Sequence, residues 1–449
     1  MGAFRPWRRA AAVACVAGAL SGCASYRPLP LDTRAPLRHR VSDLQHPGLA
    51  LRLPLTVPAV ALLAVENDPD LRAARAERGV AQAEVVQAGI LPNPSVTGSL
   101  LPVLSGPGVA PAWTAGLSED LRSLVTLTAR KQAARATAGQ VNASLLWQEW
   151  QVAGKASLLA VDIMEGGAQL RLLEQTRALL AERYNLTRRA VAQGNADLST
   201  LSPDLAALDD TRRQIGDLDR QQQARRHELD ALLGLAPDAV LPLAPAPDLP
   251  PVDPAAVERM LPALADRRPD LIALRLGYAA QDARLRAAIL AQFPALTIGI
   301  TGGSDTSNVR TFGPQVTLDL PVFDRNQGNI RIARATRRQL HDAFSARLAA
   351  ATGEIQAMLA DMALLQRQIS TARGQLAATE AITREAEAAF RAGNLTERAY
   401  VDFVTARAAQ RQQVLGWRQS LLEQRVGLAT LIGAGMPTAD LATKGGGPV

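Results

Sequence analysis

Cysteine is almost absent from this chain of 449 residues. It has two cysteines, Cys15 and Cys23, and Cys15 lies in an N-terminal segment that we expect to be removed after export. The mature chain would then keep one cysteine, so it has no internal disulfide. Histidine is also scarce, and no pair has the spacing of metal ligands: His39, His46, His227 and His341. We therefore expect no metal site, no bound cofactor and no catalytic residues.

Long hydrophobic runs and aromatic residues are scarce too. After Cys23 no segment has 18 consecutive apolar residues, which argues against a helix that crosses a bilayer. Aromatic residues make up 4% of the chain, while Ala, Leu, Arg and Gln dominate, as in long helices. The net charge of +7 falls to +4 without the three arginines of the N-terminal segment, and both signs are mixed. Nucleic acid is therefore not indicated as a partner.

Proline is absent from two long stretches, Ala112 to Ser202 and Val322 to Met436, although the chain has 28 prolines. Proline disrupts helix interiors, so these stretches are where long helices can form. We predict one helix from about Thr126 to Ala192 and another from about Asn326 to Arg391. Each would be about 100 Å long at 1.5 Å per residue, too long for the inside of a single globule.

The two stretches belong to a tandem repeat of roughly 170 residues. Residues 134–140 read ARATAGQ and residues 333–339 read ARATRRQ. Pro-Asp-Leu occurs at 69–71 and again at 269–271, and Gly194-Asn195 recurs as Gly393-Asn394. Each glycine turn would reverse the chain into a return helix that ends at a second glycine, Gly234 or Gly433. A proline-rich belt is predicted between the repeats, from Leu235 to Pro254.

A short helix is predicted in each repeat, in the stretches 58–92 and 269–292 that contain the Pro-Asp-Leu motif. Two strands are predicted between this short helix and the long helix that follows it. Residues 296–301 and 315–320 alternate strictly, with Ile298 on an apolar face and Thr297 and Gln315 on a polar face. The first repeat shows a weaker pattern. The small hydroxyl and acidic groups of the polar face fit membrane strands, and a soluble hairpin packed on helices fits the same pattern equally well. Four strands cannot close a barrel and open edges are not tolerated in lipid, so membrane strands would require an oligomer.

The N-terminus has the pattern of an export signal. Three arginines precede an apolar core from Ala10 to Leu20, and the run ends in Leu20-Ser21-Gly22-Cys23. This ending resembles the bacterial lipobox, in which the cysteine thiol is lipidated after cleavage. Ala24 and Ser25 follow, unlike the aspartate that commonly retains lipoproteins in the inner membrane. The resemblance implies an outer-membrane lipoprotein that carries palmitate.

In this order, these features resemble the TolC family of trimeric outer-membrane channels, in the lipoprotein branch with OprM and CusC. Leu91-Pro92-Asn93-Pro94 before the first strand and residues 320–328 (LPVFDRNQG) after the last strand add to the likeness. The resemblance implies a mainly α protomer with a small β part, whose duplicated halves supply long periplasmic helices and four transmembrane strands. Three protomers would form a 12-stranded β-barrel and an α-helical barrel.

The resemblance also implies a function, the exit duct of a tripartite efflux system that passes small toxic compounds or metal ions out of the periplasm. The partners would be a periplasmic adaptor, an inner-membrane pump of the RND type and outer-membrane lipid. A type I secretion duct for polypeptides and a non-transporting lipoprotein scaffold are the alternatives. Adaptor docking would use the two glycine turns and their neighbours: Gly194, Asn195, Gly393, Asn394 and Leu395.

A periplasmic gate is the last site that the resemblance implies. The family's acidic positions, six and nine residues after the second tip glycine, are Ala399 and Asp402 here. A trimer would therefore present a ring of three Asp402 carboxylates, and acidic rings favour cations. The alternative is a surface ion pair between Asp402 and a neighbouring arginine such as Arg398.

The expected organisation has six parts. A signal peptide and a lipid-anchored segment precede the first repeat, a proline-rich linker separates the repeats, and a tail follows the second. Their boundaries are 1–22, 23–56, 57–235, 236–267, 268–434 and 435–449.

Overall fold

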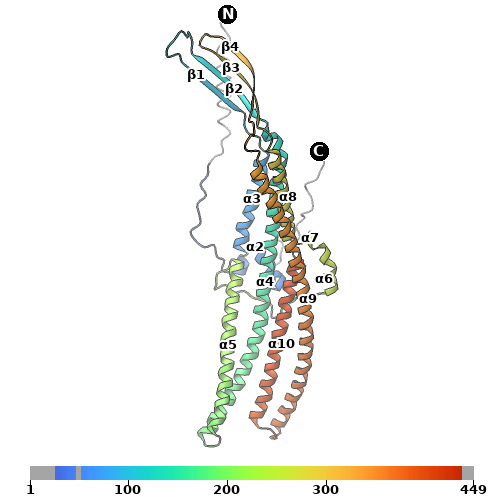
Figure 1. Cartoon of the computed structure of the whole chain (residues 1–449). Helices are drawn as coiled ribbons and strands as arrows, with labels where there is room; N and C mark the ends of the chain where they lie inside the picture. Colours follow the sequence, from blue (N-terminus) through green and yellow to red (C-terminus); the bar gives the residue numbers. More distant parts are fainter. Residues whose placement is uncertain (1–25, 47–51, 437–449) are drawn as a thin grey trace. The chain divides into compact units, whose positions relative to one another are not determined.

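The computed structural model describes residues 26–46 and 52–436. The chain divides into two units, Met1–Leu37 and Arg38–Val449. In the first unit the described residues, 26–37, form no helix or strand. All helices and strands of the described residues lie in the second unit (Figure 1).

Four long helices dominate the second unit: α4 (Arg122–Ala192), α5 (Leu198–Leu233), α9 (Gln327–Arg391) and α10 (Glu397–Ile432). The proline-free stretches therefore do form helices, and α4 with 71 residues is about 105 Å long. One proline, Pro203, lies inside α5. It occupies the second turn of the helix, where its missing N–H leaves one carbonyl without its usual donor.

The shorter helices are α2 (Val57–Asn67), α3 (Pro69–Gly89), α6 (Pro254–Met260), α7 (Leu264–Arg267) and α8 (Pro269–Leu290), with the 3₁₀ helices η1 (Val41–Asp43) and η2 (Leu261–Ala263). Of these, α2, α3, α6 and α8 have a proline at one of their first two positions, where its fixed φ is preorganised for a helix. The predicted helical stretch 58–92 is thus two helices. The carboxylate of Asp68 accepts a hydrogen bond from the Leu71 amide at 2.8 Å, and this cap starts α3.

Helix α4 is the centre of the packing, because it contacts α2, α3, α5, α8 and α10. The largest buried cluster joins α2, α4 and the end of α5, and it includes the fully buried Leu63, Val161 and Leu229. Burying one such side chain contributes about 1.5 to 3 kcal/mol. Residues 235–253 form no helix or strand, but two isolated bridges, Arg38 with Leu235 and Leu55 with Leu243, hold this belt to the unit.

The four strands form one antiparallel sheet in the order β1-β2-β3-β4: β1 (Ser95–Leu101), β2 (Ala112–Asp120), β3 (Leu296–Ser304) and β4 (Arg310–Leu318). The two hairpins join because β2 pairs with β3, with Leu117 opposite Ile300. The chain enters the sheet from α3 and α8 and leaves it into α4 and α9. The glycine turns lie at the opposite ends of α4 and α9 (Figure 1).

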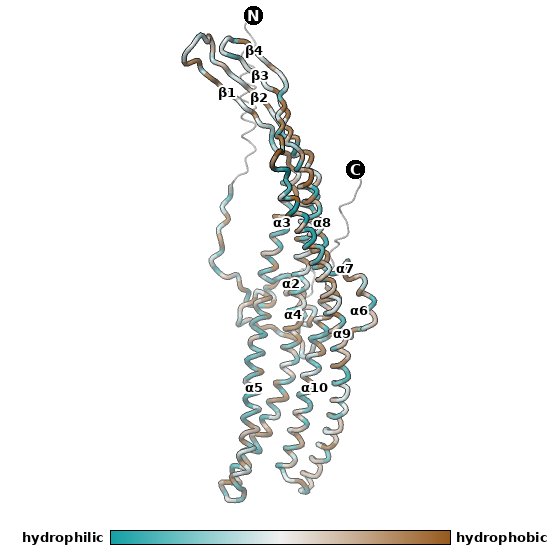
Figure 2. Tube along the Cα trace, viewed as in Figure 1, coloured by the Kyte–Doolittle hydropathy of each residue, from teal (hydrophilic) through white to brown (hydrophobic). Residues whose placement is uncertain are grey.

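One helix departs from the expectation drawn from apolar runs. By length and composition alone, α9 contains a window that would suffice to cross a membrane, although only 22% of that window is buried. The same helix packs along α8 and α10, as the other long helices pack along their neighbours. Hydrophobic segments also occur along the strands and where strands and helices meet (Figure 2).

Candidate functional site

Both hairpin tips have the same backbone structure, a helix C-terminus closed by a left-handed glycine. At the first tip, Gly194 has φ +74° and its N–H donates to the Val191 carbonyl at 3.0 Å. The Asn195 N–H donates to the Ala190 carbonyl at 2.8 Å. This pair of bonds is the Schellman motif. It needs glycine for its backbone, since a Cβ on Gly194 would meet no atom within 4 Å.

The second tip repeats the motif. Gly393 has φ +76°, and its N–H and that of Asn394 donate to the carbonyls of Phe390 and Ala389 at 3.0 and 2.9 Å. Leu395, another residue predicted for docking, is half-buried beside this turn. The rings of Phe390 and Tyr400 stack with centroids 5.1 Å apart and brace the start of α10.

An ionic cluster lies a few turns from these tips. Arg183 of α4, with 11% of its side chain exposed, contacts Asp204 of α5 at 2.7 Å and Asp402 of α10 at 2.5 Å. Arg398 of α10 lies 3.5 Å from the same Asp204 carboxylate, and the Thr187 hydroxyl donates to it at 2.7 Å. We call Arg183, Asp204, Arg398 and Asp402 the tip cluster. Burial would lower the pKa of Arg183, but its bonds to the two aspartates raise it.

The tip cluster corrects one sequence-based alternative. Asp402 does not pair with Arg398 on its own helix, because Arg398 turns to Asp204 and Asp402 binds Arg183. Arg183 and Asp204 were missed by sequence reasoning, since the Arg183–Asp402 pair joins positions 219 residues apart. A buried apolar group of Leu180, Leu208 and Val401 underlies the contact.

The two faces of the sheet differ in composition as predicted. One row of directly opposed residues runs Val96, Leu117, Ile300 and Pro314, and the next row, on the other face, runs Thr97, Gly116, Thr301 and Gly313. Ile298 shares the first face with Val316, whereas Thr297 and Gln315 lie on the second. We call these the apolar face and the hydroxyl face.

The apolar face is uncovered. In the described residues no helix packs across the sheet, and Val96 and Val316 are 80% and 67% exposed. Side chains of the hydroxyl face such as Thr97 and Gln315 are exposed as well, but the backbones of β2 and β3 lie close together on this face. A Cβ on Gly299 would lie 2.4 Å from the Leu117 carbonyl oxygen, and one on Gly303 would lie 2.5 Å from that of Trp113. Such close approach is typical of the inner side of a strongly curved sheet.

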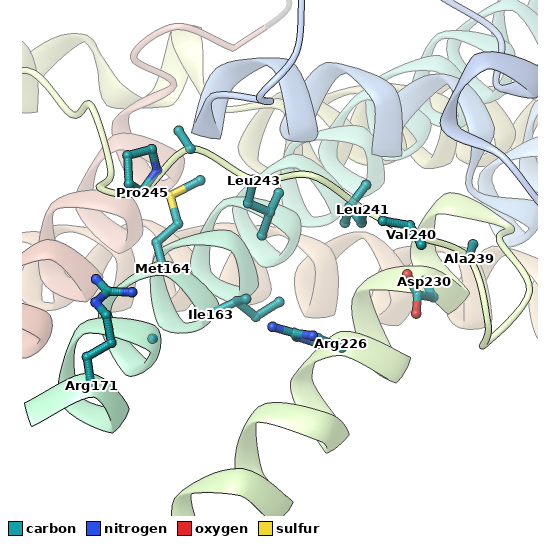
Figure 3. Close-up of a pocket in the computed structure, with 12 residues that line it drawn as sticks. Ile163, Met164, Arg171, Arg226, Asp230, Ala239, Val240, Leu241, Leu243 and Pro245 are labelled. Atoms are coloured by element: carbon teal, nitrogen blue, oxygen red, sulfur yellow. The ribbon is translucent and has the colours of Figure 1, made fainter. Parts of the chain in front are cut away.

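A cavity of about 360 Å³ lies between α4, α5 and the belt (Figure 3). Its wall is mainly apolar, with Ile163 and Met164 from α4 and Leu241 and Leu243 from the belt. Asp230 also lines it, and burial raises the pKa of this carboxyl despite the nearby charges of His227 and Arg226. Its lining residues include no nucleophile beside a base, so nothing here indicates a catalytic site. The cavity is a gap between the belt and the helices on which it packs.

Residues 302–305 read Gly-Gly-Ser-Asp, a serine between turn residues that could be taken for a catalytic nucleophile. Ser304 ends β3, and the carboxylate of Asp305 accepts from the amides of Ser307 and Val309 at 2.9 and 2.8 Å. This closes the turn of a hairpin, whereas a nucleophile elbow needs a strand followed by a helix. No group of three His, Cys, Asp or Glu side chains with the geometry of a metal site occurs in residues 26–46 and 52–436. The predicted lipidation residue, Cys23, lies outside the described residues.

In a comparison with known sequences, residues 260–434 match the model of the family described as outer membrane efflux protein. The chain is 26% identical over 334 residues to the probable efflux pump outer membrane protein TtgC of Pseudomonas putida, an alignment of 70% of this chain. It spans 64% of the length of TtgC. With the outer membrane protein OprJ of Pseudomonas aeruginosa it shares 27% identity over 252 residues, 52% of this chain and 51% of OprJ.

Comparison with solved structures shows the fold. The crystal structure of CusC superposes with a TM-score of 0.65 at 21% identity and covers 84% of this chain and 92% of CusC. The open state of the MtrE outer membrane channel of Neisseria gonorrhoeae gives a TM-score of 0.68 at 19% identity, covering 85% and 89%. The mainly α fold with a small antiparallel sheet is therefore confirmed.

Proposed function

We propose that this chain, a member of the outer membrane efflux protein family, is the exit duct of a tripartite efflux system. It would conduct small toxic compounds or metal ions passively from the periplasm to the exterior. The observation that carries the proposal is a sheet with an uncovered apolar face, an opposite face of small polar residues and two open edges, β1 and β4.

Such a sheet suits a barrel built from several chains. Alternation of apolar and small polar residues is the pattern of membrane strands, with the apolar face toward lipid and the polar face toward a lumen. The edges β1 and β4 must pair when they enter lipid, and a second copy of the chain supplies the partner strand. Three copies give the 12 strands of the channels that the fold resembles.

The helical part would extend the duct into the periplasm. The hairpins α4–α5 and α9–α10 supply its walls, and the tips at Gly194 and Gly393 supply the docking points for an adaptor. An RND-type inner-membrane pump completes the system. The names of TtgC and ArpC, both outer membrane proteins of efflux pumps, support a role in efflux.

The periplasmic mouth would be closed near the tip cluster. In this structure the charge of Asp402 is balanced by Arg183, so the carboxylate acts first as an acceptor that ties α10 to α4. Opening the mouth would separate this pair and expose a ring of Asp402 carboxylates, which favours cations.

Lipid anchoring at Cys23 would hold the protein at the outer membrane. Mass spectrometry of the mature chain tests it, because an unmodified Cys23 or a different mature N-terminus contradicts the anchor.

Conductance across planar bilayers tests the proposed function most simply. The detergent-extracted protein should have the mass of a trimer and should open steady, water-filled pores after reconstitution. A monomer that binds vesicles without conducting would instead support the periplasmic scaffold.

A further inference from the structure

A second polar cluster joins α4 to α10, far from the tips. The side-chain amide of Gln419 donates from one nitrogen to two carboxylates, Asp162 at 2.8 Å and Glu423 at 2.9 Å. Arg225 of α5 lies 3.3 Å from the other oxygen of Asp162. Gln169 donates to the Gln419 carbonyl at 2.8 Å, which fixes the orientation of the amide between the acids.

A third carboxylate lies one helical turn away on α4. Glu165 is 3% exposed, and Arg418 approaches one of its oxygens at 3.3 Å. The other oxygen, Oε2, is buried and has no hydrogen-bond partner among the described residues. Buried carboxylates without full hydrogen bonding are costly in the charged form.

The charges of this cluster do not balance. The carboxyls of Asp162, Glu165 and Glu423 face two guanidinium groups, those of Arg225 on α5 and Arg418 on α10. Apolar residues such as Leu422 adjoin them. One proton therefore neutralises the excess charge. Burial raises the pKa of Glu423 and the adjacent Asp162 raises it further, and burial raises the pKa of Glu165 against the opposing effect of Arg418.

We propose that Asp162, Glu165, Gln419 and Glu423 form a proton-dependent clasp between the two helical hairpins of one chain. The hairpins α4–α5 and α9–α10 contact each other directly mainly through α4 and α10, and further up α8 packs on both α4 and α9. With the proton bound, Gln419 and the neutral carboxyl bridge the helices. Without it, like charges on α4 and α10 face each other and favour separation.

The direction of the pH effect follows from the raised pKa values. In separated helices the carboxyls would be solvated, with ordinary values near 4.5. The clasp is therefore fully effective below that value and weakens as pH rises through the raised pKa. One proton changes the ratio of joined to separated hairpins by at most about tenfold per pH unit.

The clasp is separate from the tip cluster. Glu423 follows Asp402 by 21 residues on α10, a distance of about 30 Å along the helix. Acid would thus hold the hairpins together at mid-length whether or not the tip cluster is intact. The proposal concerns movement of helices and does not depend on what the duct conducts.

Distances between spin labels test the clasp. Labels on the exposed positions of Ala178→Cys in α4 and Ala409→Cys in α10 report the hairpin separation, with labelled chain diluted in unlabelled chain so that pairs within one chain dominate. We expect the separated fraction in lipid to rise from pH 5 to pH 8. Glu423→Gln, which stays neutral, should remove this rise, while Asp217→Asn, which alters an exposed carboxylate on α5, should keep it.

A parent distance that does not change with pH, or a Glu423→Gln protein that keeps the parent's pH dependence, would overturn the clasp. Infrared spectra of the parent provide a test without mutation. The clasp requires a carboxylic acid that stays protonated above the ordinary pKa of 4.5, so the absence of its carbonyl band at pH 5 would contradict the clasp. The distances do not rely on conduction. A protein that moves with pH but never conducts would refute the exit duct and leave the clasp standing.

Discussion

The two repeats share their turns and differ in their side chains. The tips at Gly194 and Gly393 have the same bonds and φ values within 2° of each other, +74° and +76°. The return helices end at Gly234 and Gly433, again with positive φ. Duplication has thus preserved the positions at which the backbone must reverse, because only glycine adopts that conformation readily.

The starts of the long helices show the first difference. Helix α4 begins at Arg122, directly after the sheet, whereas α9 begins at Gln327, six residues later in the register of the repeat. The second copy has proline at the position of Arg122, Pro321, and Asn326 has φ +59° just before α9. Because these six residues precede the helix in the second copy, α9 has 65 residues and α4 has 71.

The Pro-Asp-Leu motif shows the second difference. In the first copy the preceding residue, Asp68, caps α3. In the second copy the preceding residue is Arg268, which is fully buried over the ring of Trp147, 4.8 Å from its centroid, and bonds Asp270 at 2.8 Å. Pro-Asp-Leu therefore starts a helix in both repeats, and in the second repeat its aspartate also joins a buried ion pair.

Replacing Asp68 and Arg268, the residues before the two Pro-Asp-Leu motifs, should give the largest difference between the repeats. Arg268→Ala leaves a cavity and removes one of the two arginines that pair with Asp270. We therefore expect a loss of about 3 to 5 kcal/mol in the free energy of unfolding. Asp68→Ala removes one helix cap and should cost only about 1 kcal/mol. Denaturant unfolding of the reconstituted protein measures both.

Equal costs at the two positions would mean that Arg268 does no more than start α8. The pH dependence provides a further check. Burial would raise the pKa of Asp270, but the hydrogen bonds and charges of Arg268 and Arg347 hold it below its ordinary value. This contribution is present above the ordinary pKa and is lost as pH falls through the lowered one. Asp270→Asn should therefore flatten the loss of stability in acid.

Substitutions in the strands test whether the two repeats contribute equivalent strands to one barrel. Val96 in β1 and Ile300 in β3 lie in one row of the apolar face. Arginine at either position should cost about 2 to 4 kcal/mol near the bilayer midplane. The same is expected for Ile298→Arg, whereas Thr297→Arg on the hydroxyl face should cost much less. Unfolding from lipid vesicles measures the differences, and equal costs on the two faces would reject the membrane assignment.

The tip glycines should give matched effects. Gly194→Ala and Gly393→Ala each place a Cβ on a left-handed residue, at a cost of about 1 to 2 kcal/mol. Neither Cβ meets another atom, so backbone strain is the whole effect and the two losses should agree. Thermal unfolding tests this. A much larger loss at one tip would show a contact there that the shared Schellman motif does not explain.

Asp402 should have the smallest effect on stability and a clear effect on conduction. Its side chain is 60% exposed, and exposed pairs contribute at most about 1 kcal/mol. We expect Asp402→Ala to raise the resting conductance and weaken cation preference in planar bilayers. Glu387→Ala, nearer the tip on the other helix of the same hairpin, removes an exposed surface pair with Arg391 and should change neither. Unchanged conductance in Asp402→Ala would place the closure elsewhere, for example at the packing of Leu395.

The second repeat lacks counterparts of the two residues that the first hairpin contributes to the tip cluster. At an offset of 199 residues, Arg183 corresponds to Ile382 and Asp204 to Phe403. The ionic partners supplied by the first hairpin are thus replaced by apolar residues in the second. The tip cluster is asymmetric, with Arg398 and Asp402 of the second hairpin reaching across to the first.

Sequence reasoning succeeded where structure depends on local backbone chemistry. Glycine reversals, proline helix starts and alternating strands follow from a few neighbouring residues, so the helices ending at Ala192 and Arg391 and all four strands were predicted. Contacts between distant helices were not. The pairing of Arg183 with Asp402 and of Asp162 with Gln419 depends on how α4 lies against α10, which no short motif specifies.

Cysteine accessibility in lipid tests most directly whether the two repeats line one shared lumen. Thr97→Cys and Thr301→Cys lie on the hydroxyl face, one in each repeat, and Val96→Cys and Ile300→Cys lie beside them on the apolar face. A charged, membrane-impermeant thiol reagent should label both threonine positions and reduce conductance. It should leave the valine and isoleucine positions unlabelled. Equal labelling on the two faces, or labelling in one repeat alone, would contradict the account.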